Sequence, residues 1–88
     1  MNLITEQVTN NQAITSLDQV TLGQALVVVK MDMETSWLKK FLNLGLKVGS
    51  EICITNKSKS AFIAQAGTSR IAIAPQLASK ILVQTNTN

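Results

Sequence analysis

Residues 37–49, WLKKFLNLGLKVG, constrain the fold more than any other stretch of the chain. The large apolar residues recur at spacings of three and four, which places them on one side of a short helix. They are Trp37, Leu38, Phe41, Leu42 and Leu44. Gly45 should end this helix, because glycine enters the left-handed conformation of a C-terminal cap without a Cβ penalty, and Leu46 should then fold back onto Phe41. Gly49 supplies a second turn before the next strand, so helix, glycine stop, turn and strand form one unit.

The boundaries of this unit and of its neighbours follow from local signals. Thr35 or Ser36 is the expected N-cap of the helix. Residues 16–19, SLDQ, fit a capping box, so we expect one helical turn there. A second helical turn is expected over residues 75–78, because Pro75 suits a first helical position. We predict strands from runs of β-branched and alternating residues, at 25–29, 51–55, 61–66, 70–73 and 81–83.

Together these elements predict a mostly β domain built on a small barrel. Five short strands with tight turns are expected to close on themselves, which removes exposed edges. One α-helix lies between the first and second strands and plugs an open end through Trp37 and Phe41, and a short helical turn precedes the last strand. The 88 residues are enough for one domain with a small core. We assign residues 1–15 to a flexible extension, 16–84 to the barrel and 85–88 to a polar tail.

The charged residues are distributed unevenly along the chain. Residues 1–37 hold one lysine and four carboxylates, whereas residues 38–88 hold six lysines and one arginine against one carboxylate. The basic half favours an acidic partner. However, the cations are scattered and no aromatic-studded strand accompanies them, so dedicated nucleic-acid binding is not expected.

Few residues in the sequence could carry reaction chemistry. There is no histidine, and only Asp32 and Glu34 show a spacing at which two metal ligands could converge, so neither a metal site nor a cofactor is expected. Cys53 is the one candidate nucleophile, but it has no histidine to act as its base. Gly45 and Gly49 are turn glycines rather than parts of a phosphate-binding loop. We therefore predict a protein without enzymatic activity.

The sequence also suggests where the protein works. A single cysteine fits a reducing compartment, and the N-terminus lacks the cationic and apolar regions of a secretory signal. No apolar run approaches the ~20 residues that span a bilayer. A cytoplasmic location without insertion into the membrane is expected.

Several motifs in their order resemble the FeoA family, small cytoplasmic accessory proteins of bacterial ferrous-iron uptake. They are Ser16-Leu17 followed by Gly23, residues 42–49 (LNLGLKVG), residues 71–74 (IAIA) and residues 78–83 (ASKILV). The resemblance covers residues 16–84. It implies an SH3-like β-barrel, and as partner the cytosolic, GTPase-linked part of the FeoB permease, whose transport the protein would modulate. It implies no catalytic residues.

The same barrel also occurs in DtxR-like iron-dependent repressors, so a regulatory module acting by protein–protein contact is the alternative function. The sequence departs from the family pattern at two places where arginine is common, since it has Lys39-Lys40 before the helix stop and Ala74 after the IAI strand. Lysine and alanine do not reproduce arginine's planar fork. An activity that depends on those guanidinium groups is therefore not implied.

Four basic residues are the candidate contacts to a partner. They are Lys39, Lys40, Lys47 and Arg70. We expect the other residues of the organising stretch to be structural: Trp37, Phe41, Leu42, Gly45, Leu46 and Gly49. Unpaired edge strands of a small barrel favour self-association, so a homodimer is an assembly that the sequence leaves open.

Overall fold

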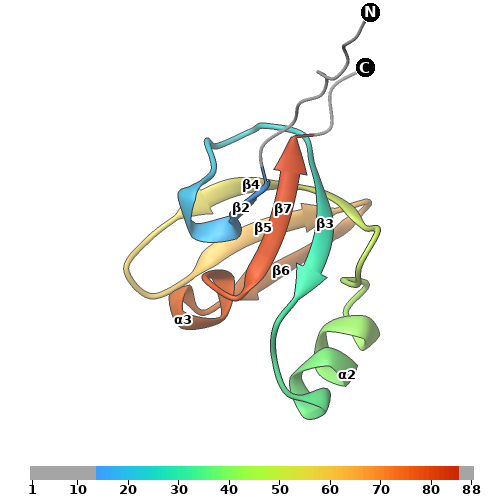
Figure 1. Cartoon of the computed structure of the whole chain (residues 1–88). Coiled ribbons are helices and arrows are strands. Elements are labelled where there is room, and N and C mark those ends of the chain that lie inside the picture. The colour runs from blue at the N-terminus through green and yellow to red at the C-terminus, as the bar shows by residue number, and fades with distance from the viewer. Residues whose placement is uncertain (1–13, 86–88) are drawn as a thin grey trace, which may run out of the picture.

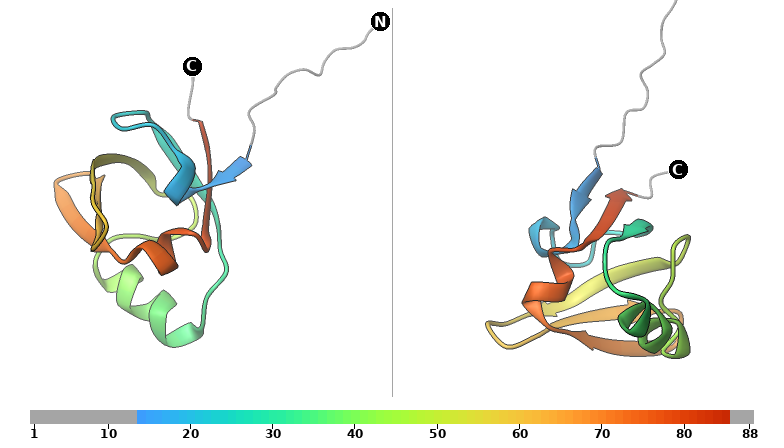
Figure 2. Two further views of the ribbon diagram at one scale, coloured as in Figure 1. Left: turned by 90° about the vertical axis from the view of Figure 1, so that its left-hand side faces the viewer. Right: turned by 60° about the horizontal axis from the view of Figure 1, so that its bottom comes forward.

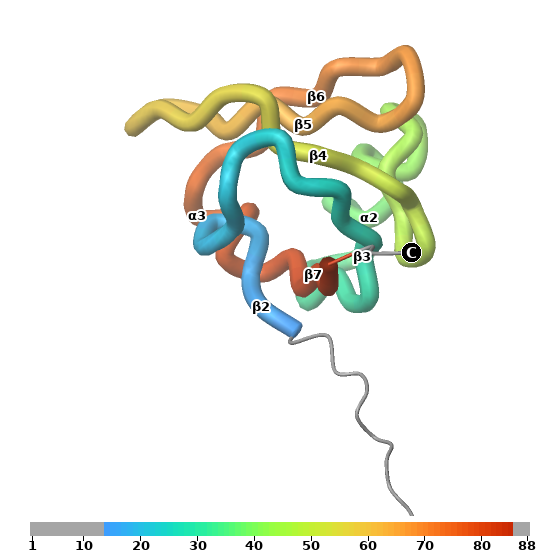
Figure 3. The backbone as a smooth tube through the Cα atoms, turned by 90° about the horizontal axis from the view of Figure 1, so that it is seen from above, coloured from blue at the N-terminus to red at the C-terminus, as the bar shows by residue number. Residues whose placement is uncertain are grey.

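Six antiparallel strands curl around one apolar core in the computed structural model, which describes residues 14–85 (Figure 1). In chain order they are β2 (Ile14–Ser16), β3 (Leu26–Met31), β4 (Glu51–Lys57), β5 (Phe62–Ala66), β6 (Ser69–Ile73) and β7 (Ile81–Thr85). Their order across the sheet is β2-β7-β3-β4-β5-β6. Seen from above, the strands surround the interior, with β5 and β6 on the side opposite β2 and β7 (Figure 3).

Alternation along the strands builds the core. In β3 to β7 alternate side chains turn inward, so Leu26 and Val28 of β3 lie on the same core-facing side as Ile52 and Ile54 of the neighbouring strand β4, with Leu26 in register with Ile52. The other apolar residues of the core come from all parts of the described chain. They are Leu17, Val20, Met31, Phe41, Leu46, Phe62, Ala64, Ile71, Ile73, Ala78, Ile81 and Val83. Only Phe41 and Phe62 of these core residues are aromatic, so aliphatic side chains fill most of the interior.

Three helical segments connect the strands. The 3-10 helix η1 (Leu17–Gln19) follows β2, the α-helix α2 (Thr35–Asn43) lies between β3 and β4, and the short helix α3 (Pro75–Ala78) precedes β7. Pro75 lies in the first turn of α3, as predicted. Figure 2 shows α2 below the sheet, at the open end of the curled strands. The predicted helix and both helical turns are present, but the additional strand β2 places α2 between the second and third described strands rather than between the first and second.

The predicted strand number and barrel closure need correction. Ile14 and Thr15, which we assigned to the flexible extension, pair with Gln84 and Val83 and form the sixth strand with Ser16. Thr85, assigned to the polar tail, belongs to β7. The outer strands β2 and β6 do not pair with each other, so no ladder closes the sheet within residues 14–85. The rest of the predicted extension and tail, 1–13 and 86–88, lies outside the described residues.

The end of α2 is a Schellman cap. Gly45 has φ +96°, its N–H donates to the carbonyl of Leu42 (3.0 Å), and the Leu46 N–H donates to the carbonyl of Phe41 (2.8 Å). These are the two hydrogen bonds that define this motif. Leu46 and Phe41 both enter the core, as predicted. At Gly49, φ is +95° and the N–H donates to the carbonyl of Val28 (2.8 Å), which ties the second turn to β3.

The predicted helix starts were less accurate. The N-cap of α2 is Glu34 rather than Thr35 or Ser36, and its side chain makes no capping hydrogen bond. At η1 the Ser16 hydroxyl donates to the Asp18 carboxylate (2.5 Å) instead of capping the backbone, so the predicted capping box does not form. In a capping box the hydroxyl oxygen accepts from a backbone N–H, whereas here the hydroxyl is turned to donate to a carboxylate two residues away, a strong charged acceptor.

Candidate partner-binding surface

Helix α2 is attached to the domain by a narrow strip. Of its nine residues only Phe41 is buried, and Leu38 packs against the core while remaining partly exposed. The prediction of a broad apolar face is therefore wrong for Leu42 and Leu44, which are 54% and 52% exposed. Both lie in the last turn and cap, where the helix leaves the core. The helix thus presents most of its surface to solvent.

Trp37 lies at the edge of the buried strip. Its ring is 38% exposed and lies 6.1 Å from the ring of Phe41, centroid to centroid, at an interplanar angle of 30°. The Nζ atom of Lys40 lies 4.7 Å from the centroid of the Trp37 ring, within the range of a cation–π contact. Spacings of three and four along the helix bring these side chains together. Trp37 therefore acts both as a neighbour of the core and as an exposed aromatic surface with a cation over it.

A shallow pocket of about 260 Å³ adjoins the exposed side of Trp37. Its walls come from the start of α2, the segment before it and the α3 region. The residues lining it are Met33, Glu34, Trp37, Leu77 and Lys80. Met33 and Leu77 pack against the core, so the lining of the pocket is largely apolar and also includes one carboxylate and one ammonium group. Such a depression fits an apolar side chain of a partner protein rather than a reacting substrate.

The structure brings only part of the predicted contact set together. Lys39 and Lys40 are exposed on α2, and Lys47 is exposed in the turn that follows, where its backbone N–H donates to the Ser50 hydroxyl (3.0 Å). Arg70 is exposed on β6, in register with Gln65 of β5, on a different element from the three lysines. The candidate surface is therefore α2 with its pocket, which we call the α2 surface, and Arg70 belongs to another element, strand β6.

Three exposed apolar residues on or after α2 were not predicted as partner contacts from the sequence. Leu42, Leu44 and Val48 are each more than half exposed. No acidic residue occurs between positions 35 and 50, whereas three lysines do. That combination of apolar residues and lysines without carboxylates is visible in the sequence and is the signal that could have marked the surface.

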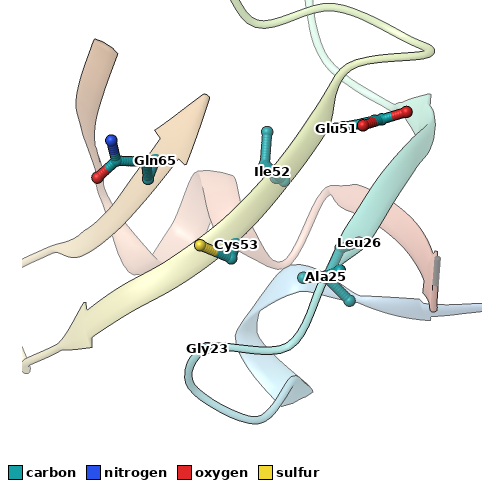
Figure 4. A pocket seen from close by; sticks show the side chains of 7 residues that line it. All are labelled: Gly23, Ala25, Leu26, Glu51, Ile52, Cys53 and Gln65. Carbon is teal, nitrogen blue, oxygen red and sulfur yellow. The ribbon is translucent and has the colours of Figure 1, made fainter. Parts of the chain in front are cut away.

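The sequence also raised a possible metal site and a possible nucleophile, and the structure gives little support to either. Within residues 14–85 no group of three or more potential metal ligands comes together, and Asp32 and Glu34 are both exposed. Cys53 is half-buried on the outer face of β4, because alternation turns it away from Ile52 and Ile54. It lines a depression of about 250 Å³ whose walls hold Glu51, on β4, and Gln65, on β5 (Figure 4). Glu51 is the one ionisable side chain besides Cys53 in that lining, and no histidine accompanies it.

In the described part of the chain, no helix has the length and apolar character needed to cross a bilayer. The pocket and the exposed helix together form the candidate surface.

Comparison with known structures supports the fold. A crystal structure of an iron uptake regulatory protein (FeoA) is 23% identical and covers 84% of this chain and 100% of its own, with a TM-score of 0.75. The FeoA protein from Chlorobium tepidum is 15% identical over 83% of this chain and 71% of its own, with a TM-score of 0.77. The manganese regulator SloR is 19% identical over 82% of this chain and 34% of its own, with a TM-score of 0.71. At these identities the likeness establishes the fold, which is the SH3-like β fold expected.

No curated protein sequence matches the chain. The family model of the FeoA domain, in contrast, matches residues 15–85, which are nearly all of the described residues. This match agrees with the resemblance seen in the sequence motifs. The chain therefore belongs to the FeoA family, small accessory proteins of iron transport.

Proposed function

We propose that this protein is a non-enzymatic accessory protein that binds the cytosolic, GTPase-linked part of a FeoB-type permease in the cytoplasm and modulates ferrous-iron transport. The observation that carries the proposal is the α2 surface. It joins an exposed tryptophan, an adjoining apolar pocket and lysines without acidic neighbours on α2, in a protein of the FeoA family.

The energetics of such a contact favour the Trp37 region as its centre. Interfaces gain most of their affinity from a few well-packed aromatic, aliphatic and arginine anchors, while charges at the rim mainly raise the association rate. Trp37 and its pocket supply an anchor point, and Lys39 and Lys40 supply the basic rim. An acidic surface on the partner with one projecting apolar side chain is the complementary arrangement. Lys47 and Arg70 are proposed as outer contacts only.

Titration calorimetry with the purified cytosolic part of the permease tests this proposal, with guanine nucleotide present and absent. Trp37→Ala should weaken binding by at least about tenfold, in keeping with the loss of one interface anchor. A Lys39→Glu/Lys40→Glu double variant should slow association. The matched control is Lys59→Glu, since Lys59 is exposed in the loop between β4 and β5, away from α2. No heat of binding in either nucleotide state would overturn the proposal.

The likeness to SloR favours a second candidate function, that of a regulatory module acting by protein–protein contact. In that case the partner is a transcription factor rather than a permease. A pull-down in which the protein retains a metal-dependent repressor but not the permease part would favour this alternative.

A further inference from the structure

Strand β6 is one of the two outer strands of the sheet, and it is the longer of them, with five residues against three in β2. It pairs with β5 in unbroken register from Ser69↔Ala66 to Ile73↔Phe62. In contrast, the register of both the β3–β7 and β4–β5 ladders shifts at a bulge or irregularity. A long, regular outer strand offers a row of backbone groups to another strand.

The β5–β6 hairpin fixes which backbone groups face outward. Its loop has two residues, Gly67 and Thr68, between the paired Ala66 and Ser69. Gly67 has φ +62°, and no residue other than glycine has positive φ among the described residues, a combination typical of a type II′ turn. In a two-residue hairpin the flanking pair exchanges both hydrogen bonds, and such pairs alternate along the ladder. The N–H and C=O groups of Ser69, Ile71 and Ile73 therefore face β5.

The N–H and C=O groups of Arg70 and Ala72 consequently point away from the sheet. No backbone hydrogen bond from another described segment reaches either residue, and no side chain is bonded to them. Both residues are exposed. Ala72 is small, which lets a second backbone approach, and no proline or lysine lies within the strand. Two donors and two acceptors are thus available at this edge.

We propose that β6 pairs with β6 of a second copy of this chain, antiparallel and centred on Ile71. In this register Arg70 of each copy lies opposite Ala72 of the other, and both residues offer outward-facing groups. Four interchain hydrogen bonds result. Ile71 lies opposite Ile71 in the intervening non-hydrogen-bonded pair, with each side chain already buried in the core of its own copy, so the backbone bonds carry the contact. The proposal does not depend on the proposed function.

The neighbouring registers are less favourable. Centring the pair on Arg70 places the two guanidinium groups directly opposite each other, an arrangement that destabilises a sheet. Centring it on Ala72 brings in Ala74, whose carbonyl already accepts hydrogen bonds from the N–H groups of Leu77 and Ala78 at 2.9 Å each. The register centred on Ile71 avoids both. On the outer face it lets the aliphatic part of Arg70 cover Ala72 of the second copy.

Sedimentation equilibrium of the full chain at increasing concentration tests the association. We expect a reversible monomer–dimer equilibrium, weak because one edge strand buries little surface. Ala72→Pro removes one outward N–H per copy, hence two of the four bonds, and should weaken dimerisation by at least about tenfold. Ala72→Ser keeps the N–H and is the matched control, expected to dimerise like the parent. Thermal melts followed by circular dichroism verify that both variants fold.

Cross-linking tests the register. In a Cys53→Ser background, the Arg70→Cys/Ala72→Cys double variant should form disulfide-linked dimers under mild oxidation, since paired Cα atoms across strands lie within disulfide range. Each single variant should cross-link far less, because its cysteine faces a residue of another type. A chain that stays monomeric at all concentrations would overturn the proposal. The proposal would also be overturned if the parent chain were monomeric and its Ala72→Pro variant lost binding to the cytosolic part of the permease. The β6 edge would then pair with a strand of that partner rather than with a second copy.

Discussion

Gly45 offers the sharpest test of how the organising stretch works. At φ +96° a residue with a side chain is strained, and a Cβ built at this position meets no heavy atom within 4 Å. A substitution there is therefore strained by the backbone alone, without a steric clash. For an L-residue the left-handed region costs about 1–2 kcal/mol, and a β-branched residue fits it worst. We expect Gly45→Val to lower the free energy of unfolding by about 2 kcal/mol.

Asparagine separates this conformational effect from any other consequence of losing glycine. It tolerates left-handed backbone better than other residues with a side chain, so Gly45→Asn should cost clearly less than Gly45→Val. Urea unfolding measures both. With a slope of about 1 kcal/mol per molar urea for a domain of this size, the valine variant should unfold at about 2 M lower urea, with unchanged slope. A thermal melt should drop by about 8–16 °C.

Two results would refute this reasoning. A valine variant as stable as the parent would mean that the positive φ at Gly45 is not required for the Schellman cap. Equal losses for asparagine and valine would mean that the cost does not come from the left-handed backbone.

Two further changes examine the core and the surface. Leu46→Ala removes a side chain that is 0% exposed and should lower the free energy of unfolding by about 2–5 kcal/mol, measured by urea titration. Leu44→Ala, at a position 52% exposed, should change it by no more than about 0.5 kcal/mol. Similar losses for both variants would mean that the fold-back of Leu46 is not a core contact. Lys57→Met removes the ammonium group that donates to the Val20 carbonyl and should lower the free energy of unfolding by roughly 1 kcal/mol. Lys59→Met should leave it nearly unchanged by the same measurement. Equal effects of the two variants would contradict a stabilising role for the Lys57 hydrogen bond.

The sequence predicted the parts of the fold that short-range rules decide. Gly45 and Gly49 have no alternative to positive φ at sharp turns, and Pro75 has few positions in a helix that it can occupy, so these elements came out as expected. The inward side chains of β3 and β4 likewise follow from alternation. The resemblance to the family motifs then led to the prediction of an SH3-like fold.

Long-range competition accounts for what was missed. Residues 14–16 include the β-branched Ile14 and Thr15, but the segment is only three residues long and forms β2 because β7 offers an edge to pair with. Leu42 and Leu44 match a helical pattern but lie where α2 turns away from the core, which periodicity does not reveal. Arg70 was chosen as a contact candidate for its charge; it lies on β6 rather than on α2, and its role as a contact stays a prediction. Each error concerns where an element lies relative to others.

The narrow attachment of α2 has a consequence for how the family can diversify. Phe41 and Leu38 tie the helix to the interior, while the remaining α2 positions contribute little to the stability of the sheet. Under the proposed function, substitutions there would change the contacts to a partner with little effect on folding. Recognition on one side of this small protein could then change during evolution while the β scaffold stays as it is.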